Sequence, residues 1–254
     1  TFILHLSLGK RFGFPAIVEV EPIYAGTVGD LLAWFNSQGP IITTTLVAYN
    51  IAVVAQEVQR GVAGRLKSND ENVLTALYRL VARSRRRYGG YTVHIGIAVM
   101  FLGFSGRAWE VTKEVSMEVG RSVQIDEYTM TYKGPRSEAD HEKRMVFTDI
   151  AVQRDGEDLG LISPARYVYR ASPEQPSTEV DRYVSMRNDL YVSLGGVDPD
   201  KGIASFRVHI NPLVSFVWLG VGILILGAML CMWPEASLQE VGAFGYVKAL
   251  GSAA

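Results

Sequence analysis

The chain has 254 residues, a formal net charge of −1, 48% hydrophobic residues and a mean hydropathy of +0.12. This composition is too apolar for a disordered chain and too polar for a protein wholly embedded in a membrane, so it indicates a few membrane spans joined to a soluble domain. The single cysteine, Cys231, excludes an intrachain disulfide and a Cys-x-x-Cys redox pair. Neither a start methionine nor a signal peptide opens the chain at Thr1, so we expect the numbering to begin within a longer protein or after processing.

Residues 1–39 contain apolar stretches but no convincing span. Phe2–Leu8 is followed by Lys10, and the stretch 16–34 is interrupted by acidic residues. We therefore predict an extracytoplasmic or interfacial segment over 1–39. The basic stretch Gly9–Phe14 lacks the spacing of a phosphate loop and is interpreted as a connector.

Residues 40–59 are the first predicted transmembrane helix. Pro40 suits the first turn of a helix, because its missing N–H would be unpaired there anyway. Asn50 and Gln56 are the polar residues of this segment. We interpret them as groups that hydrogen-bond to neighbouring helices, with contact to a ligand or substrate as the alternative.

Residues 60–87 form a basic loop, which the positive-inside rule places in the cytoplasm. Its basic residues are Arg60, Arg65, Lys67, Arg79, Arg83, Arg85, Arg86 and Arg87. Within the loop, 72–82 has the apolar periodicity of an amphipathic helix. Such a helix lies on lipid headgroups, whereas a nucleic-acid partner is disfavoured because no aromatic platform accompanies the charge.

Residues 88–106 are the second predicted transmembrane helix, and they contain His94. The segment carries no formally charged residue over about the 20 residues that a span requires. An ionisable side chain inside a span is costly, so His94 is a candidate metal or haem ligand; the alternative is a histidine hydrogen-bonded to a neighbouring helix. Glycines thin one part of the surface, which allows close approach of another helix or a flat ligand. They are Gly89, Gly90, Gly96, Gly103 and Gly106.

Residues 107–211 are rich in strand patterns and predict a compact antiparallel β domain outside the cytoplasm. The strongest hairpin signal is Asp155-Gly156, between apolar runs at 145–154 and 160–169. Further strands are predicted at 109–120, 123–132, 180–186, 189–194 and 204–210. We expect Lys133-Gly134-Pro135 to close the strand at 123–132.

Residues 212–233 are the third predicted transmembrane helix, uncharged from Leu213 to Trp233. Trp218 and Trp233 would lie at the outer and inner interfaces, as aromatic belts prefer. Cys231 is interpreted as a small apolar residue that faces lipid or a helix. Residues 234–254 are predicted to be a short cytoplasmic tail.

No hydrolytic site is indicated by the remaining reactive side chains. The other histidines, His5, His141 and His209, are scattered along the sequence, and no His-Glu-x-x-His motif occurs. His141 lies in a charged run typical of a solvated loop. His209 lies just before the third span, and we interpret it as structural or surface-exposed.

Several short motifs occur in a fixed order through these segments. They are Gln56-Glu57, Arg85-Arg86-Arg87-Tyr88-Gly89-Gly90-Tyr91, Val93-His94-Ile95-Gly96, Pro164-Ala165-Arg166-Tyr167, Ser177-Thr178-Glu179-Val180, Asp189-Leu190-Tyr191-Val192, Asn211-Pro212-Leu213-Val214 and Trp218-Leu219-Gly220. This series resembles the CcmF family, the membrane haem lyase subunit of cytochrome c maturation. The similarity covers residues 41–233 well and 1–40 only weakly.

The resemblance implies a cofactor and a reaction. His94 would be one axial ligand of a membrane haem b, and that haem would supply electrons that reduce the incoming haem. The complete lyase attaches haem to Cys-x-x-Cys-His apocytochrome c through thioether bonds. The resemblance therefore implies that this chain is part of an enzyme; it assigns no catalytic residue.

The sequence departs from the family in what it lacks. The family's tryptophan-rich haem-handling segment, its partner transmembrane histidine and its two extracytoplasmic histidines are missing from 1–40, and His5 does not match them. The chain thus resembles only the carboxyl-terminal part of a lyase. The second haem ligand is expected from another segment or chain.

The partners implied by the resemblance are the remainder of the lyase, the haem chaperone, apocytochrome-presenting subunits, apocytochrome c and the lipid bilayer. We expect a bacterial cytoplasmic membrane, with the β domain in the periplasm, or an organelle inner membrane. The alternative function is a non-catalytic membrane scaffold with a structural His94. A transporter is disfavoured because no inverted repeat or pair of broken helices is present.

Overall fold

The computed structural model describes residues 1–198 and 201–233, so the tail predicted over 234–254 lies outside the described residues. The chain divides into two compact units, each assembled from two separate segments. The first unit combines Thr1–Thr44 with Leu102–Val217, and the second combines Thr45–Phe101 with the chain from Trp218 onward. The first unit therefore holds the β domain, and the second holds most of the long helices.

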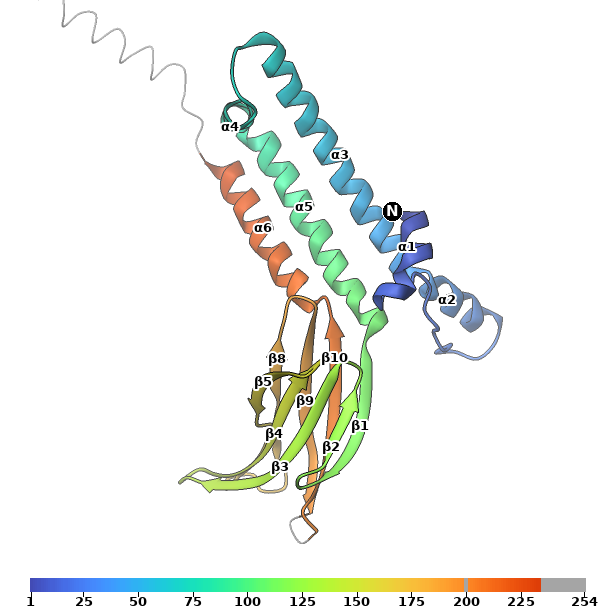
Figure 1. Ribbon diagram of the computed structural model, residues 1–254, viewed down its shortest axis with the longest axis vertical. Coiled ribbons are helices and arrows are strands. Elements are labelled where there is room, and N and C mark those ends of the chain that lie inside the picture. The colour runs from blue at the N-terminus through green and yellow to red at the C-terminus, as the bar shows by residue number, and fades with distance from the viewer. Residues whose placement is uncertain (199–200, 234–254) are drawn as a thin grey trace, which may run out of the picture. The chain divides into compact units, whose positions relative to one another are not determined.

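Within the described residues, three helices are long and apolar enough to cross a membrane, and Figure 1 shows them as α3, α5 and α6. They are α3 (Gly39–Ser68), α5 (Arg85–Ser105) and α6 (Val214–Met232). A helix satisfies its backbone hydrogen bonds internally, which is what allows such a segment to lie in hydrocarbon. The predicted fold class, about three transmembrane helices with an antiparallel β domain, is confirmed by these helices and the sheets described below.

The region predicted as a basic loop contains more helix than expected. α3 continues to Ser68, nine residues past the predicted end at 59, because this stretch contains no proline and Glu57 pairs with Arg60 one turn later at 3.5 Å. The amphipathic helix is α4 (Val73–Arg83). Asn72 caps it, since its side chain accepts a hydrogen bond from the Thr75 N–H at 2.8 Å. Only a short connection separates α3 from α4.

Helices α5 and α6 pack through glycines. A Cβ added at Gly96 would lie 2.8 Å from the Gly220 carbonyl oxygen, and one added at Gly227 would lie 2.9 Å from that of Gly89. Side chains larger than hydrogen are excluded at such positions, and the two backbones can therefore approach closely. Cys231 also faces α5, where its thiol donates to the Arg86 carbonyl at 3.5 Å. It is thus helix-facing, one of the two positions expected for it.

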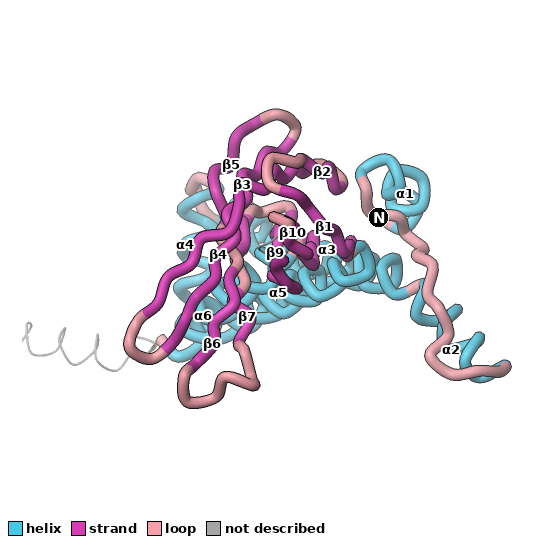
Figure 2. Tube along the Cα trace, turned by 90° about the horizontal axis from the view of Figure 1, so that it is seen from below, coloured by secondary structure: helices cyan, strands magenta, loops and turns pink. Residues whose placement is uncertain are grey.

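The β domain is a sandwich of two antiparallel sheets, with strand orders β1-β10-β9-β8 and β2-β3-β4-β6-β7, and with β5 paired to β4. The strands are β1 (Val111–Glu118), β2 (Ser122–Ile125), β3 (Tyr128–Ala139), β4 (Lys143–Arg154), β5 (Glu157–Ile162), β6 (Ala165–Tyr169), β7 (Ser177–Glu179), β8 (Asp181–Val184), β9 (Asn188–Asp198) and β10 (Ile203–Pro212). Figure 2 shows β3, β4 and β6 on one side of the domain and β1, β9 and β10 on the other.

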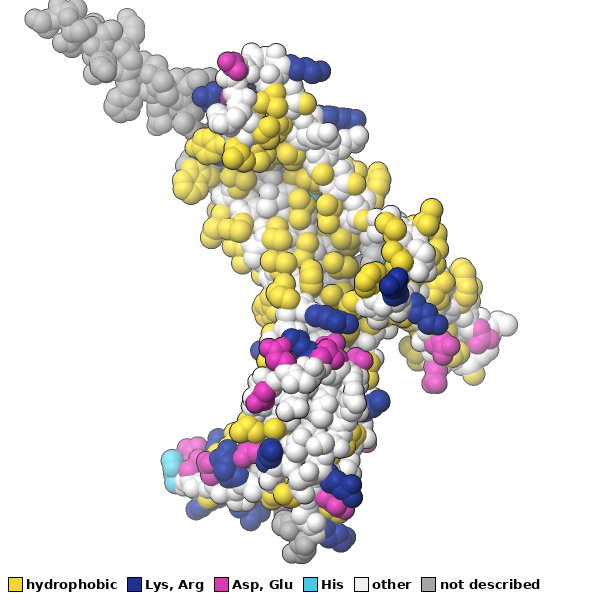
Figure 3. All heavy atoms as spheres, viewed as in Figure 1, with side chains coloured by type: hydrophobic (Ala, Val, Ile, Leu, Met, Phe, Trp, Pro, Cys, Tyr) yellow, Lys and Arg dark blue, Asp and Glu magenta, His cyan; other side chains and the backbone are white. Residues whose placement is uncertain are grey.

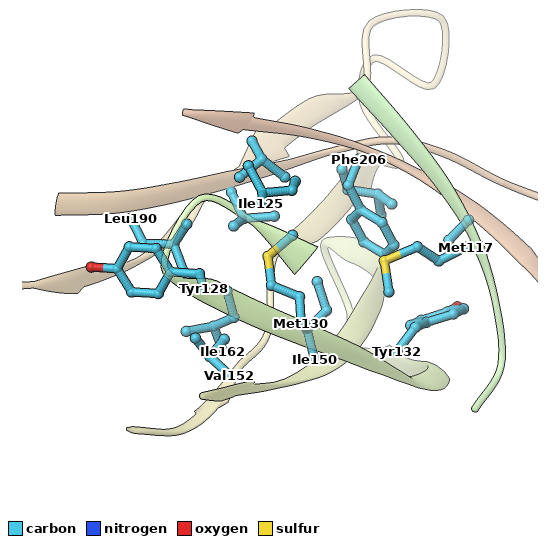
Figure 4. Close-up of a cluster of buried hydrophobic side chains, with 14 of the residues drawn as sticks. Met117, Ile125, Tyr128, Met130, Tyr132, Ile150, Val152, Ile162, Leu190 and Phe206 are labelled. Carbon is cyan, nitrogen blue, oxygen red and sulfur yellow. The ribbon is translucent and has the colours of Figure 1, made fainter. Parts of the chain in front are cut away.

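The core of the sandwich lies between the two sheets. Figure 4 shows its large side chains pointing toward one another from both sheets. Tyr128, Met130 and Tyr132 alternate along β3 and are each fully buried. This is the period-two pattern of a strand that buries one of its faces.

Two strand boundaries were predicted wrongly. The stretch 123–132 is a hairpin, β2–β3, whose turn includes Asp126 at φ 53°, and β3 runs through Gly134 and Pro135 to Ala139. The stretch 160–169 is two strands, because Pro164 interrupts the ladder between β5 and β6. The hairpin at Asp155-Gly156 was predicted correctly; both residues have positive φ, as a tight turn requires.

The amino-terminal segment forms α1 (Phe2–Leu8), the 3₁₀ turn η1 (Gly9–Phe12) and α2 (Thr27–Ser37). It joins the start of the β domain at Trp109, in the 3₁₀ turn η2 (Gly106–Trp109), whose indole donates to the Pro15 carbonyl at 2.9 Å. Phe14 packs edge-on against the same indole, with ring centroids 5.0 Å apart. Trp109, predicted as part of a strand, is therefore an anchor for this segment.

Candidate functional site

His94 lies on a face of α5 that no described helix covers. The α6 side of α5 is marked by Gly89, Val93, Gly96 and Met100, all of which contact α6 closely. Successive helical residues are rotated by about 100°, so His94 lies on the far side from this row. Its side chain is exposed, and no hydrogen bond or ion pair joins it to any residue in 1–198 or 201–233.

The residues that share this open face occur at helical spacing. Gly90, His94, Ile97 and Phe101 follow at intervals of four, three and four. Ile97 is 37% exposed and Phe101 56% exposed, and a Cβ added at Gly90 would meet no atom within 4 Å. We call these four residues the open face of α5. Figure 3 shows how densely apolar side chains cover the helices.

The arginine end of α5 is tied to α3. The Arg87 guanidinium donates to Glu57 Oε2 at 2.6 Å and to the Tyr91 hydroxyl at 2.9 Å. Tyr88 packs its hydroxyl against Gly61 of α3, where an added Cβ would lie 2.8 Å away. The charge of Arg87 is therefore matched within the chain. Arg86 is exposed, and no described residue pairs with its guanidinium.

The connection between α3 and α4 is organised by Glu71. Its carboxylate accepts hydrogen bonds from Arg65 and Arg79, each at 2.8 Å. The bond from Arg65 is the main reason that the pKa of Glu71 lies below its ordinary value. These pairs hold α4 beside α3 while Val73, Leu74 and Tyr78 stay exposed. This arrangement fits the predicted membrane-surface helix.

The other three histidines belong to the first unit, and none joins a ligand cluster. His5 is hydrogen-bonded to Thr44 Oγ1 at 2.8 Å and to the Phe14 carbonyl at 3.0 Å, which makes it structural. His141 is exposed near the β3–β4 turn. Throughout the described residues, no group of three or more His, Cys, Asp or Glu side chains could hold a metal ion.

The β domain matches a known family. Residues 108–212 match the model described as the CcmF C-terminal β-sandwich. Cytochrome c-type biogenesis proteins CcmF from Escherichia coli and Haemophilus influenzae are each 28% identical, over 156 and 153 residues. These alignments cover 61% and 60% of this chain. The chain matches the carboxyl-terminal part of CcmF.

A solved structure extends this match to the helices. The chain described as "Cytochrome c Heme Lyase CcmF" superimposes with a TM-score of 0.64 at 21% identity, over 92% of this chain. The likeness supports the same fold for the helices and the sandwich together. This chain spans about a quarter of the length of the curated CcmF relatives, 24% and 23%, and 34% of the solved CcmF chain.

Sequence reasoning identified His94 but not its surroundings. The open space beside Gly90 and the exposed Arg86, which has no partner among the described residues, were not singled out, although the spacing Gly90-x-x-x-His94 is visible in the sequence. The interpretation of Asn50 as an interhelical hydrogen-bonding group finds no partner among the described residues, where its Oδ1 is buried and unpaired.

His209 lies on β10, opposite Thr112 of the edge strand β1, and its contacts fit a structural role, one of the two roles interpreted for it from the sequence. Its Nδ1 lies 3.0 Å from Glu110 Oε1 and 2.9 Å from Thr112 Oγ1, and its ring packs against Tyr191. The hydrogen bond from His209, assisted by one from Thr112, holds the pKa of Glu110 below its ordinary value. A depressed carboxyl pKa contributes stability above the unfolded pKa, about 4.3, and that stability is lost as the pH falls through the folded value.

We therefore expect Glu110→Gln to destabilise the β domain more at pH 7 than at pH 3, because protonation of Glu110 at low pH removes part of the charge that the substitution removes. The expected loss is about 1 kcal/mol at pH 7, or roughly 4 °C in the melting temperature, and thermal unfolding followed by tryptophan fluorescence measures it. Glu114→Gln is the control, because Glu114 is a highly exposed carboxylate paired with Arg207 on the same pair of strands. A loss of equal size at both pH values would show that the Glu110 charge is irrelevant.

Proposed function

We propose that this chain is the carboxyl-terminal portion or a subunit of a cytochrome c haem lyase, in which His94 is one axial ligand of a membrane haem b. The complete lyase would attach haem covalently to Cys-x-x-Cys-His apocytochrome c. This chain would contribute to that reaction without being complete on its own. The observation that supports this most directly is the exposed, unpaired His94 on α5, in a chain that matches CcmF.

The residues around His94 fit a haem. A neutral imidazole binds haem iron, and paired histidines give a low-spin centre suited to electron transfer. His94 makes no hydrogen bond to the described residues, so both ring nitrogens are available. Beside it, the absence of a side chain at Gly90 leaves room for a flat group against the helix. Ile97 and Phe101 provide the apolar surface that a porphyrin contacts.

The second axial ligand would come from outside this chain. The other histidines, His5, His141 and His209, all belong to the first unit, whereas His94 belongs to the second. The chain spans about a quarter of its CcmF relatives, which leaves most of such a protein to supply a histidine. The tryptophan-rich haem-handling region would come from the same source.

The β-sandwich would contact the partners. Haem chaperone, apocytochrome-presenting subunits and apocytochrome c are the partners proposed for it by analogy with CcmF. Arginines at the start of α5 favour a cytoplasmic amino-terminal end for this helix. A single crossing would then put the sandwich, which follows α5 in the chain and precedes α6, in the periplasm of a bacterium, with the helices in the inner membrane.

Co-purification tests the ligand assignment. The chain is expressed with the polypeptide that completes the lyase, and the reduced b-type Soret band is measured per mole of complex for wild type, His94→Ala and His209→Ala. We expect His94→Ala to lose the band or shift it strongly, because the iron would lose a ligand, and His209→Ala to keep it. A wild-type band in His94→Ala would exclude this assignment and favour the alternative, a non-catalytic scaffold with a structural histidine.

A further inference from the structure

The arrangement of Arg86, Gly90 and His94 along α5 suggests how a bound haem would be oriented. The three residues are spaced by four, and each step of four rotates only about 40° around a helix, so they follow one another along one side. An exposed guanidinium, a stretch of backbone without a side chain and an exposed imidazole therefore follow one another within about 12 Å along the helix axis, and neither the guanidinium nor the imidazole has a partner among the described residues. This order has the polarity of a haem, which carries two carboxylates on one edge.

We propose that the haem b lies flat along α5 with one edge over Gly90 and with a propionate carboxylate bound by Arg86. This inference rests on the proposed haem ligation by His94. It makes Gly90 and Arg86 positioning residues for the cofactor. The propionate edge then faces the arginine end of α5, and the apolar edge lies over Ile97 and Phe101.

Gly90 is the residue that permits this approach. Two other glycines of α5 in the second unit, Gly89 and Gly96, pack against α6. A Cβ added at either would clash with α6 backbone atoms, at 2.9 and 2.7 Å. Gly90 has no such neighbour within 4 Å. Packing against α6 therefore explains Gly89 and Gly96 but leaves Gly90 unexplained. Gly90 lies one helical turn before His94. A planar group bound at His94 would explain why this position has no side chain.

Arg86 is the arginine suited to the carboxylate. Arg87 points its guanidinium at Glu57 and Tyr91, so its charge is already compensated. Arg86 is exposed and unpaired among the described residues, and its backbone is fixed by the Cys231 contact. A guanidinium binds a carboxylate through two parallel hydrogen bonds, which fixes orientation as well as affinity. The side-chain reach of an arginine and of a propionate together can bridge the distance to an iron at His94.

A titration with two haems tests the orientation. The apo form of the complete complex in lipid nanodiscs is titrated with haem b and with its dimethyl ester, which lacks both carboxylates, and Soret absorbance gives the apparent Kd. We expect Arg86→Gln to weaken binding of haem b by at least tenfold, because charge-assisted hydrogen bonds to the propionate are lost, and to leave binding of the ester unchanged. Arg83→Gln is the control, because it removes the same charge from the end of α4. We expect it to change the apparent Kd of haem b and of the ester by the same factor.

Gly90→Leu is expected to weaken the binding of haem b and of the ester by at least tenfold each, because a leucine would occupy the space beside His94. Gly222→Leu is the matched control, since Gly222 on α6 also has no atom within 4 Å of an added Cβ. The proposed orientation is overturned if Arg86→Gln changes the apparent Kd of haem b and of the ester by the same factor. It is also overturned if Gly90→Leu binds both with the wild-type Kd. Either result together with haem loss in His94→Ala would leave the ligand assignment intact, whereas unaltered haem in His94→Ala would remove both.

Discussion

Replacing Gly96 with leucine is expected to separate α5 from α6. An added Cβ there would lie 2.7 Å from the Leu224 nitrogen, 2.8 Å from the Gly220 oxygen and 3.0 Å from the Leu224 Cα. All three are backbone atoms, so no side-chain rotation can relieve the clash and the helices must move apart. Forcing extra atoms into a packed contact costs about 1–3 kcal/mol, and here the loss extends to the neighbouring contact between Gly89 and Gly227. We expect about 3 kcal/mol.

Cys231 provides a direct readout of this separation. It is the only cysteine of the chain, and a Cβ added at Gly89 would lie 2.6 Å from its sulfur. Thiol labelling by a maleimide in nanodiscs is therefore expected to accelerate at least tenfold in Gly96→Leu, because opening the helix pair exposes the thiol. Gly222→Leu adds the same side chain to an uncontacted face of α6 and should label at the wild-type rate. An unchanged labelling rate in Gly96→Leu would mean that α5 and α6 do not pack through their glycines.

The sequence predicted the helices of this fold because charge marks their ends. The gap between Arg87 and Arg107 located α5, although the helix also includes the arginines as its first turn. It could not predict which side of α5 meets α6, because apolar residues occur all round the helix. The seven-residue spacing of Gly89, Gly96 and Gly103 holds that information, since each faces close-packed atoms. The sequence indicated that these glycines allow close approach to the helix. It did not distinguish the glycines that contact α6 from Gly90, which does not.

The β domain shows a complementary limit of sequence reasoning. Asp155-Gly156 was recognised as a turn because glycine accepts positive φ without cost. The turn at Asp126 was missed because neither Asp126 nor Glu127 is glycine, although aspartate tolerates the left-handed conformation. Conversely, Gly134-Pro135 was expected to end a strand, but β3 accommodates it with a bulge after Tyr132. In both cases the pairing of β3 with the strand before or after it in the sequence outweighed the local signal.

His94 could be proposed as a ligand from sequence, but its availability could not. Whether an intramembrane histidine is satisfied by a neighbouring helix depends on which face it occupies. The structure places His94 away from α6 and leaves it unpaired among the described residues. Every other histidine belongs to the first unit, so none of them shares a unit with His94.

Replacing Phe206 with alanine is expected to destabilise the β-sandwich by about 3–5 kcal/mol, the usual cost of truncating a buried aromatic residue. Phe206 is 1% exposed on β10, and its ring packs edge-on against Tyr132 of β3 with centroids 5.4 Å apart. It therefore bridges the two sheets (Figure 4). Because domains of this size are stable by only about 5–15 kcal/mol, the truncation removes a large part of the total.

Hydrogen–deuterium exchange of the β9 and β10 amides measures this loss in the membrane-bound chain. Protection that depends on opening of the whole sandwich should fall by about a hundredfold or more in Phe206→Ala, since each 1.4 kcal/mol is tenfold. Val184→Ala is the control, because Val184 on the edge strand β8 is 51% exposed and its truncation should cost less than about 0.5 kcal/mol. If both variants exchanged alike, the two sheets would not depend on the contact between Phe206 and Tyr132. A selective loss would instead show that the sandwich resists opening through its inter-sheet core.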